Sequence, residues 1–385
     1  MKKRVRMAVL GSRGIPAKYG GFETFAEELA TRLAATGFEV DVFCEAEEKL
    51  PEGFYKGVRL IYIKRYRIGP FTTILFDIAS FWKARKQYDL VYMLGYGAGF
   101  FAFVPRLWKT KVWINMDGVE WARSKWSYLA RLWFKSMEWT SIRTASRVIA
   151  DAEAIKMHLI RRHGSRHECS VIAYGAYPVI AAPNPSGLKN WGLERDRYFL
   201  VVCRLEPENH VLEIIRGFIA SGSEKRLIIV GEIRNPGPYV SKLIATEDER
   251  VLFIGTVFDK ELLTCLRFYC HAYFHGHSVG GTNPSLLEAM GCGNLIIAHD
   301  NGFNREVLGN TGVFFKDENT IPDVVRKIEE LEPGHQQLKT GALARIVEKY
   351  SWEQIASQYV ELLGSDLQIN PNSPNVVAEK ETRFR

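Results

Sequence analysis

The side chains best suited to hold a ligand lie in residues 275–293, HGHSVGGTNPSLLEAMGCG. The stretch SLLEAM within this segment looks helical. Pro284 and Ser285 fit the first turn of that helix, and Asn283 fits its N-cap. The amides and hydroxyls of residues 280–283 would then lie at a helix start, where the helix dipole favours an anion. The segment predicts an anion site, and the alternative is an ordinary turn.

Two charged side chains extend this prediction. Glu288 lies one turn inside the expected helix, too deep to cap it, and could accept hydrogen bonds from ligand hydroxyls such as a ribose diol. Its alternative role is an ion pair with a nearby Lys or Arg. Arg204 follows the apolar run YFLVVC, where a guanidinium can hold two phosphate oxygens or form a surface salt bridge. Taken together with the N-terminal glycines, these residues favour a ligand site.

A glycine-rich loop, GSRGIPAKYGG, follows the first predicted strand at residues 11–21. Its spacing departs from the G-x-G-x-x-G pattern of dinucleotide-binding folds, and no Lys-Ser or Lys-Thr pair completes a P-loop. Gly20 and Gly21 precede a helix that ends at Gly37, so their amides would face an anion at the helix start. The alternative is a flexible turn.

The segments that carry these loops alternate between strand and helix. The alternation covers residues 4–151 and resumes over residues 198–316, after a segment rich in Gly, Pro and Asn at 175–197. This pattern predicts parallel sheets covered on both faces. We therefore expect an α/β fold of two doubly wound, Rossmann-like domains that face each other across a cleft. The expected divisions are residues 1–180, residues 181–350, a closing helix at 351–365 and a polar tail at 366–385.

The bulk composition is that of a globular chain of 385 residues with a net charge of +7. Its six cysteines show no C-x-x-C spacing, which indicates reduced thiols in a cytosolic protein. The N-terminal apolar run MAVL is too short for a signal peptide, and no run reaches the ~20 residues that span a bilayer.

Aromatic and basic residues are mixed in residues 103–147. Such a mixture can lie in a lipid interface, although most tryptophans pack in cores. We expect peripheral contact with an anionic membrane surface, and no nucleic-acid partner. The tryptophans concerned are Trp108, Trp113, Trp121, Trp126, Trp133 and Trp139.

Several segments resemble one enzyme family. RLEPEN at 204–209 and GGTNPSLLEAM at 280–290 resemble the donor-binding half of GT-B glycosyltransferases, and most closely the retaining family 4. Residues 11–44 and NMDGVEWARSKW at 115–126 are similar to its bacterial rhamnosyltransferase branch, which builds cell-surface polysaccharides. YSWEQIASQYVELL at 350–363 resembles the helix that closes this fold.

The resemblance implies that the first domain binds an acceptor and the second a nucleotide sugar. Arg204 would hold the diphosphate and Glu288 the ribose, and both would act in catalysis together with Asp117 and Glu120. The implied donor-binding residues are Gly20, Gly21, Arg204, Asn209, His275, His277, Gly280, Gly281, Thr282, Asn283, Pro284, Ser285 and Glu288.

The chain departs from the family pattern at two positions. Gly280 stands where the family has the first Glu of its paired-glutamate motif, and Asn209 stands where it has a Lys. The rhamnosyltransferase branch shares these departures. One cation near the diphosphate is thereby missing, and Arg234, His275 or His277 could compensate.

These expectations describe an enzyme that moves L-rhamnose from dTDP-rhamnose to a saccharide acceptor on a lipid diphosphate carrier, with retention. No nucleophile stands out, which favours front-face attack. No D-x-D pattern occurs, so we expect no metal and no other cofactor. The protein would be cytoplasmic, on the inner face of the cell membrane. The alternatives are an NAD-dependent oxidoreductase, a nucleotide-sugar epimerase and a non-catalytic sugar- or nucleotide-binding protein.

Overall fold

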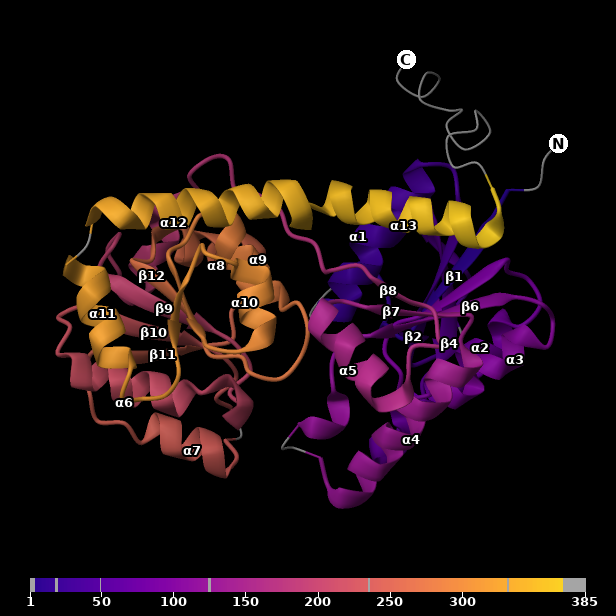
Figure 1. Cartoon of the computed structure of the whole chain (residues 1–385), viewed down its shortest axis with the longest axis horizontal. Helices are drawn as coiled ribbons and strands as arrows, with labels where there is room; N and C mark the ends of the chain where they lie inside the picture. The colour runs from indigo at the N-terminus through magenta and orange to yellow at the C-terminus, as the bar shows by residue number, and fades with distance from the viewer. Residues whose placement is uncertain are drawn as a thin grey trace, which may run out of the picture. The chain divides into compact units, whose positions relative to one another are not determined.

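A computed structural model describes residues 4–17, 20–48, 50–123, 126–234, 236–330 and 332–369. The chain divides into two compact units, each built on a sheet covered by helices (Figure 1). Unit 1 comprises residues 1–122, 126–173 and 352–385, and unit 2 comprises residues 123–125 and 174–351. The predicted α/β class with two parallel-sheet domains is confirmed.

Unit 1 contains an eight-stranded sheet in the order β3-β4-β2-β1-β5-β6-β7-β8, parallel except for the β3–β4 pair. Its strands are β1 (Arg6–Leu10), β2 (Glu39–Ala46), β3 (Gly53–Tyr55), β4 (Val58–Lys64), β5 (Leu90–Met93), β6 (Lys111–Met116), β7 (Arg147–Ala150) and β8 (Cys169–Val171). Its helices are α1 (Gly21–Ala35), η1 (Gly69–Phe71), α2 (Thr72–Ala84), η2 (Gly99–Ala102), α3 (Phe103–Arg106), η3 (Glu120–Ala122), α4 (Tyr128–Thr144), α5 (Glu153–His163) and α13 (Trp352–Leu367).

The two faces of this sheet are covered by different helices. The chain moves outward from β1 to β4 and then returns to β5, and right-handed crossovers in opposite directions place helices on opposite faces. Helices α1 and α13 pack together on one face, and α2, α3, α4 and α5 lie on the other (Figure 1).

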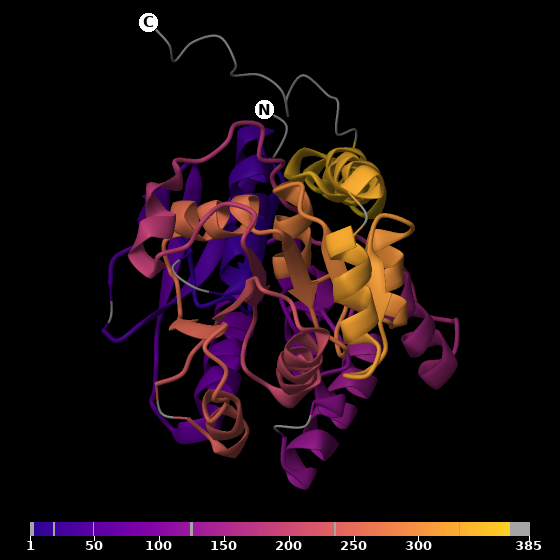
Figure 2. The same ribbon diagram turned by 90° about the vertical axis from the view of Figure 1, so that its left-hand side faces the viewer.

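Unit 2 contains a six-stranded parallel sheet in the order β11-β10-β9-β12-β13-β14, with helices on both faces (Figure 2). Its strands are β9 (Tyr198–Val202), β10 (Arg226–Val230), β11 (Val251–Gly255), β12 (Ala272–His275), β13 (Ile296–His299) and β14 (Val313–Phe315). Its helices are η4 (Pro185–Trp191), η5 (Pro207–Asn209), α6 (Val211–Ser221), α7 (Pro238–Ile244), α8 (Lys260–Tyr269), α9 (Pro284–Gly291), α10 (Gly302–Leu308), α11 (Ile321–Glu330), α12 (Glu332–Arg345) and η6 (Ile346–Tyr350).

Helix α13 is an integral part of unit 1. The hydroxyls of Tyr359 and Tyr92 are hydrogen-bonded at 2.7 Å inside the core. Near the helix end, the carboxylate of Asp366 accepts hydrogen bonds from Arg147 and from Trp113 Nε1 at 2.7 Å. Trp113 is fully buried, so the hypothesis that it lies in a lipid interface is wrong.

The segment predicted as a linker, residues 175–197, belongs to unit 2. The N–H of Ala176 donates to the carbonyl of Tyr350 at 2.8 Å, and the N–H of Val179 donates to Gly291 at 2.8 Å. Asn184 caps η4 through its side chain. The division between the units therefore falls at residues 173/174 and not at the expected residue 180, because the Gly- and Pro-rich composition marks irregular backbone that still packs.

All six cysteines are free thiols. Across the part of the chain that the structure describes, no helix is long and apolar enough to cross a membrane.

Candidate functional site

The candidate site of unit 2 lies where its strand order reverses. The chain runs from β9 outward to β11 and then returns to β12, which pairs with the other side of β9. In open parallel sheets such a switch point leaves a crevice at the carboxyl ends of the two strands. The loops that follow β9 and β12 are residues 203–210 and 276–283.

Direct hydrogen bonds join these two loops. Ser278 donates from its N–H and from its hydroxyl to the carbonyl of Glu208, at 3.0 and 2.9 Å. The ring of His210 is hydrogen-bonded through Nδ1 to the carbonyl of Gly276 at 2.8 Å. A Cβ at residue 276 would lie 2.0 Å from the carbonyl oxygen of Asn209, so this approach requires glycine. The two loops form one rigid platform.

Asn209 is a buried part of that platform, with 3% of its surface exposed. Its amide donates to the carbonyl of Arg204 at 2.6 Å, and its Oδ1 accepts a hydrogen bond from His277 Nδ1 at 2.5 Å. Both ends of the side chain are therefore used inside the protein. Asn209 was expected to bind the donor, but the structure places its side chain in loop–loop contacts.

Two histidines of the site, His275 and His277, have lowered pKa values. Burial lowers the pKa of His275 well below its usual range, and repulsion from a protonated His277 or His299 would act in the same direction. Burial, together with Arg123 and Arg204, lowers the pKa of His277 to about 4. Both shifts disfavour a charge on these two rings, so they do not support the hypothesis that either histidine replaces the missing cation.

The start of α9 has the predicted form. Asn283 is the N-cap, and its Oδ1 accepts a hydrogen bond from the N–H of Ser285 at 2.9 Å, which confirms the predicted cap. Pro284 occupies the first turn, and that turn has no acidic residue. Thr282 and the two preceding glycines are buried in the loop that leads into the helix.

Gly280 has a φ of +134°, a conformation that side chains rarely adopt. A Cβ at this position would lie 3.1 Å from His277 Nε2. The structure thus gives a physical reason for the absence of a glutamate here, because the backbone and the histidine ring leave glycine as the fitting residue.

Ser285 faces inward. Its hydroxyl donates to the carbonyl of Val202 at 2.9 Å and is hydrogen-bonded to Tyr273 at 2.6 Å. The hydroxyl therefore fixes α9 to β9 and β12. Its N–H is also used, since it donates to Asn283, so Ser285, which was expected to bind the donor, is held by contacts within the protein.

Glu288 forms an ion pair with Arg267, from Oε2 to the guanidinium, at 2.6 Å. The Arg267 side chain is 5% exposed and the Glu288 side chain is 45% exposed. The arginine thus anchors a carboxylate that still reaches solvent. Both roles considered for Glu288, ion pairing and ligand binding, are compatible with this geometry.

The exposed cations at the switch point are arginines. Arg204 lies in the loop after β9 with an exposed side chain and contributes to the low pKa of His277, which places its charge near the platform. Arg234 follows β10, the neighbouring strand, and is also exposed. Its N–H donates to Glu232 at 2.7 Å.

Unit 1 has its own switch point between β1 and β5. Gly20 caps α1 with a φ of +126°, and a Cβ there would lie 2.0 Å from Glu23 Oε2. The carboxylate of Glu23 accepts from the N–H of Arg13 at 3.3 Å, and that of Glu27 accepts from the N–H of Ala17 at 2.7 Å. Carboxylates of α1 therefore hold the glycine-rich loop, and Gly21 begins the helix.

Asp117 and Glu120 follow β6, which pairs with β5. Glu120 donates its N–H to the hydroxyl of Tyr96 at 2.7 Å and accepts from Trp126 Nε1 at 3.1 Å. Both carboxylates are partly buried. They share the carboxyl edge of the unit 1 sheet with the glycine-rich loop, whereas the remaining candidate residues lie in unit 2.

The sequence did not indicate several residues that hold the site residues in place through contacts inside unit 2. They include Arg267, Tyr273, His210 and His299. The rings of His210 and His299 stack at 4.2 Å. Arg267 could have been noticed in the sequence, because it is a charged residue next to the apolar positions of α8. Within the described ranges, no group of three or more His, Cys, Asp or Glu side chains could hold a metal ion.

Family models match both parts of the chain. Residues 188–344 match Glycosyl transferases group 1, and residues 4–177 match Domain of unknown function (DUF1972). A probable sucrose-phosphate synthase from Thermosipho melanesiensis is 24% identical over 182 residues. That match covers 45% of this chain and 42% of the relative, so it spans less than half of the relative's length.

Solved structures resemble the chain along most of its length. Sucrose-phosphate synthase from Thermosynechococcus elongatus has a TM-score of 0.77 at 18% identity, covering 95% of this chain and 100% of that one. HepE of Anabaena in complex with UDP and glucose has a TM-score of 0.76 at 18% identity, covering 94% and 100%. A glycosyltransferase from Rickettsia africae has a TM-score of 0.73 at 15% identity, covering 96% and 100%. The fold is that of GT-B glycosyltransferases, as the sequence predicted.

Proposed function

From the premise that residues 188–344 form a glycosyl transferases group 1 domain within a GT-B fold, we propose that the chain transfers a sugar from a nucleoside-diphosphate donor to a saccharide acceptor. The observation that carries the proposal is the switch-point site of unit 2. An exposed arginine and a helix start without acidic residues lie on its rigid platform. This arrangement suits a diphosphate.

The chemistry follows from where charge develops. Breaking the anomeric C–O bond leaves negative charge on the departing diphosphate, and groups fixed in advance around that charge lower the barrier. Arg204 supplies a full positive charge, and the backbone N–H groups of Gly281, Thr282 and Asn283 supply dipoles. Glu288, held by Arg267, accepts hydrogen bonds from the ribose hydroxyls. Front-face departure and attack would retain the anomeric configuration.

The donor we favour is dTDP-L-rhamnose, because the loops resemble those of the rhamnosyltransferase branch. A UDP-sugar is the second candidate. It is favoured by the similarity to HepE, whose structures contain UDP or UDP-glucose.

The acceptor would be a saccharide, carried on a lipid diphosphate, and unit 1 would bind it near Asp117 and Glu120. Carboxylates accept hydrogen bonds from sugar hydroxyls, which suits the glycine-rich loop and the edge residues of this unit. Metal independence is part of the proposal, since Arg204 and the amide dipoles would neutralise the diphosphate in place of a divalent metal ion. The product would enter surface-polysaccharide synthesis on the cytoplasmic face of the cell membrane.

Transfer assays test this proposal directly. Purified protein is incubated in EDTA with dTDP-rhamnose or UDP-glucose and a lipid-linked saccharide, and the product linkage is determined by NMR. We expect one donor to be consumed only when acceptor is present, with retained anomeric configuration. Donor conversion without acceptor would indicate an epimerase. Oxidation of NADH, added in a parallel reaction, would indicate an oxidoreductase, and either result would contradict the proposal.

A further inference from the structure

Much of the net positive charge of the chain lies in one segment of unit 1. Residues 72–122 and 126–150 contain 10 Lys and Arg and 5 Asp and Glu, an excess of five, compared with +7 for the entire chain. Two of those acids, Asp77 and Glu138, are buried. Glu138 is also paired internally with Arg162 at 3.0 Å and with His163 at 2.7 Å. The solvent-facing surface of this segment is therefore strongly cationic.

Helix α4 exposes apolar residues in the same segment. Its exposed residues fall on one side of the helix, opposite the buried Met137 and Ser141. Leu129 is 76% exposed and Tyr128 75% exposed. A surface helix normally shows mainly polar residues to solvent, whereas five of the seven exposed residues of α4 are aromatic or leucine. The exposed residues are Tyr128, Leu129, Leu132, Trp133, Ser136, Trp139 and Arg143.

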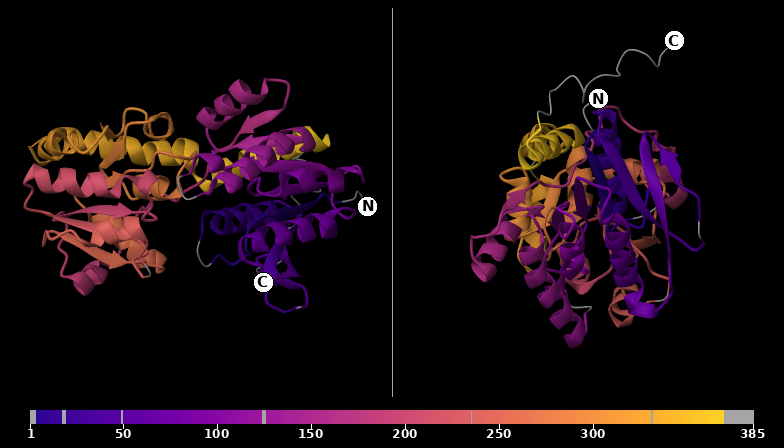
Figure 3. Two further views of the ribbon diagram at one scale, coloured as in Figure 1. Left: turned by 90° about the horizontal axis from the view of Figure 1, so that it is seen from below. Right: turned by 90° about the vertical axis from the view of Figure 1, so that its right-hand side faces the viewer.

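Helices α2, α3 and α4 lie on the same side of the sheet (Figure 3), where α2 contacts α3 and the η2 turn that leads into α3 contacts α4. Arg106 donates to the carbonyl of Thr144 at 2.8 Å and so joins α3 to the end of α4. Trp82 and Leu107 are 58% and 69% exposed. The aromatic side chains are accompanied by cations: Arg85 lies 4.4 Å from the ring of Trp82. We call this continuous surface of α2, α3 and α4 the basic-aromatic face.

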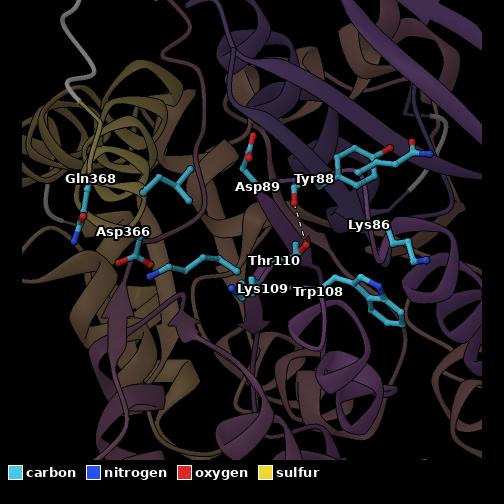
Figure 4. A pocket seen from close by; sticks show the side chains of 11 residues that line it. Lys86, Tyr88, Asp89, Trp108, Lys109, Thr110, Asp366 and Gln368 are labelled. Atoms are coloured by element: carbon cyan, nitrogen blue, oxygen red, sulfur yellow. Dashed lines mark hydrogen bonds between the residues drawn. The ribbon is translucent and has the colours of Figure 1, made fainter. Parts of the chain in front are cut away.

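A pocket of about 530 Å³ opens at the edge of this face, at the amino ends of β5 and β6 (Figure 4). Lys86, Lys109 and Lys111 line it beside Trp108, and Lys86 lies 5.2 Å from the Trp108 ring. The carboxylates in the lining have other partners. Asp366 pairs with Arg147, and Asp89 accepts from the N–H of Arg6 at 2.9 Å. The three exposed lysines are thus suited to hold a phosphate.

We propose that unit 1 docks on an anionic lipid surface through the basic-aromatic face, with its aromatic and leucine side chains at headgroup level and the lysine pocket on a lipid phosphate. Apolar anchoring and attraction to anionic lipid act together in such binding, at roughly 1 kcal/mol per basic residue near the surface. Charge complementarity selects an anionic bilayer. Exposed leucines on α4 favour lipid over nucleic acid, which has no acyl layer to receive them. This inference stands on the surface of unit 1 and does not depend on the donor proposed above.

Co-sedimentation with vesicles tests the proposal on the full chain. Vesicles of phosphatidylcholine are compared with vesicles of equal parts phosphatidylcholine and phosphatidylglycerol, at low and high salt. We expect sedimentation with the anionic vesicles alone and weaker binding at high salt, because salt screens the attraction. No binding to anionic vesicles, equal binding to both kinds, or binding to single-stranded RNA in their place would overturn the proposal.

Two variants and two matched controls locate the surface. The apolar variant is Leu129→Ser with Leu132→Ser and Trp139→Ser, and the basic variant is Lys86→Ser with Lys109→Ser and Lys111→Ser. The controls change equally exposed residues of unit 2: Ile180→Ser, Ile244→Ser and Val347→Ser, or Lys189→Ser, Lys260→Ser and Lys349→Ser.

We expect the basic variant to bind anionic vesicles about 100-fold more weakly and the apolar variant about tenfold more weakly, with both controls binding like the wild type. Controls that lose as much binding as the variants would contradict the proposed face. Melting temperature and stabilisation by nucleoside diphosphate are measured for each protein. Their preservation shows that lost membrane binding is separate from folding and from the donor site.

Discussion

Helices α1 and α9 begin at comparable places, each near the switch point of its own sheet, yet their first turns differ in charge. The start of α1 carries Glu23, and the carboxylates of Glu23 and Glu27 accept hydrogen bonds from the loop before it. The start of α9 has a neutral Asn283 cap and no acidic residue, and Arg204 lies in the adjacent loop.

The difference teaches what each site can hold. A helix start favours an anion through its amides and dipole, and a carboxylate already present there satisfies that preference internally. Unit 2 is left with an attraction for an external anion, which suits a diphosphate. Unit 1 is left with carboxylates and glycine backbone, which suit the hydroxyls of a saccharide.

The largest effect is expected from removing the cation of unit 2. Arg204→Ala should lower kcat by about 100-fold, because charge on the departing diphosphate loses its counter-ion. Arg204→Lys keeps the charge but cannot bind two phosphate oxygens in the bidentate geometry of arginine. Its kcat should therefore lie between those of the wild type and Arg204→Ala. Initial rates at saturating acceptor measure the change. A wild-type rate in Arg204→Ala would show that the anion site lies elsewhere.

A large effect is also expected at Gly280. Gly280→Ala should cost about 1–3 kcal/mol of unfolding free energy, because the residue has a φ of +134° and its Cβ would press on His277. Gly280→Glu, which introduces the residue of the wider family, should weaken donor binding. Chemical denaturation measures the unfolding free energy, and calorimetry measures donor affinity. Gly302→Ala is the control, since no atom lies near its Cβ position. A gain in donor affinity for Gly280→Glu would contradict this account of the departure.

A smaller effect is expected in unit 1. Glu27→Ala removes the acceptor for the N–H of Ala17, a bond to a charged group that contributes about 1.5–3 kcal/mol, and loosens the glycine-rich loop. We expect a raised KM for the acceptor with an unchanged KM for the donor. Glu28→Ala on the same helix, which removes a partner of Arg32, is the matched control. An equal rise in both KM values would contradict the assignment of the acceptor to unit 1.

The smallest effects should be two separate acid responses. The folded pKa of His277 is lowered from 6.5 to about 4, so unit 2 loses stability as pH falls from about 6.5 towards 4, where the unfolded chain binds the extra proton. In unit 1, burial alone would raise the pKa of Glu138, but hydrogen bonds from His163 and Trp121, together with nearby His158 at 3.7 Å, outweigh it and lower the pKa from 4.5 to about 2. That stabilisation is complete above 4.5 and is lost as pH falls towards 2.

Denaturation at a series of pH values separates the two responses. His277→Gln should flatten the stability profile between pH 6.5 and 4, and Glu138→Gln should flatten it between 4.5 and 2. Profiles that keep their shape in both variants would show that other groups govern the acid response.

Local rules were sufficient to predict much of this structure from the sequence. The cap at Asn283 and the first-turn proline follow from short-range backbone chemistry, and the strand–helix alternation follows from periodicity. The position of Glu288 one turn into α9 follows from the same rules. Arg204 could be placed after β9 because an apolar run ends there.

The inward contacts could not be predicted, because they depend on segments distant in sequence. Asn209 turns away from solvent to join His277, and Ser285 bonds to Tyr273 and Val202. Arg267 reaches Glu288 from another helix. Trp113 shows the same limit. The aromatic and basic residues around it in the sequence suggested a membrane-facing surface, but its position on a central strand buries it in the core.

The most direct test of the central claim, that unit 2 binds a nucleoside diphosphate through Arg204, is a thermal-shift titration in EDTA with dTDP, UDP, GDP and NADH. A ligand that binds only the folded state raises the melting temperature. We predict stabilisation by one nucleoside diphosphate, lost in Arg204→Ala and kept in Arg326→Ala, an exposed arginine on α11. Stabilisation by NADH alone, or equal stabilisation of wild type and Arg204→Ala, would contradict it.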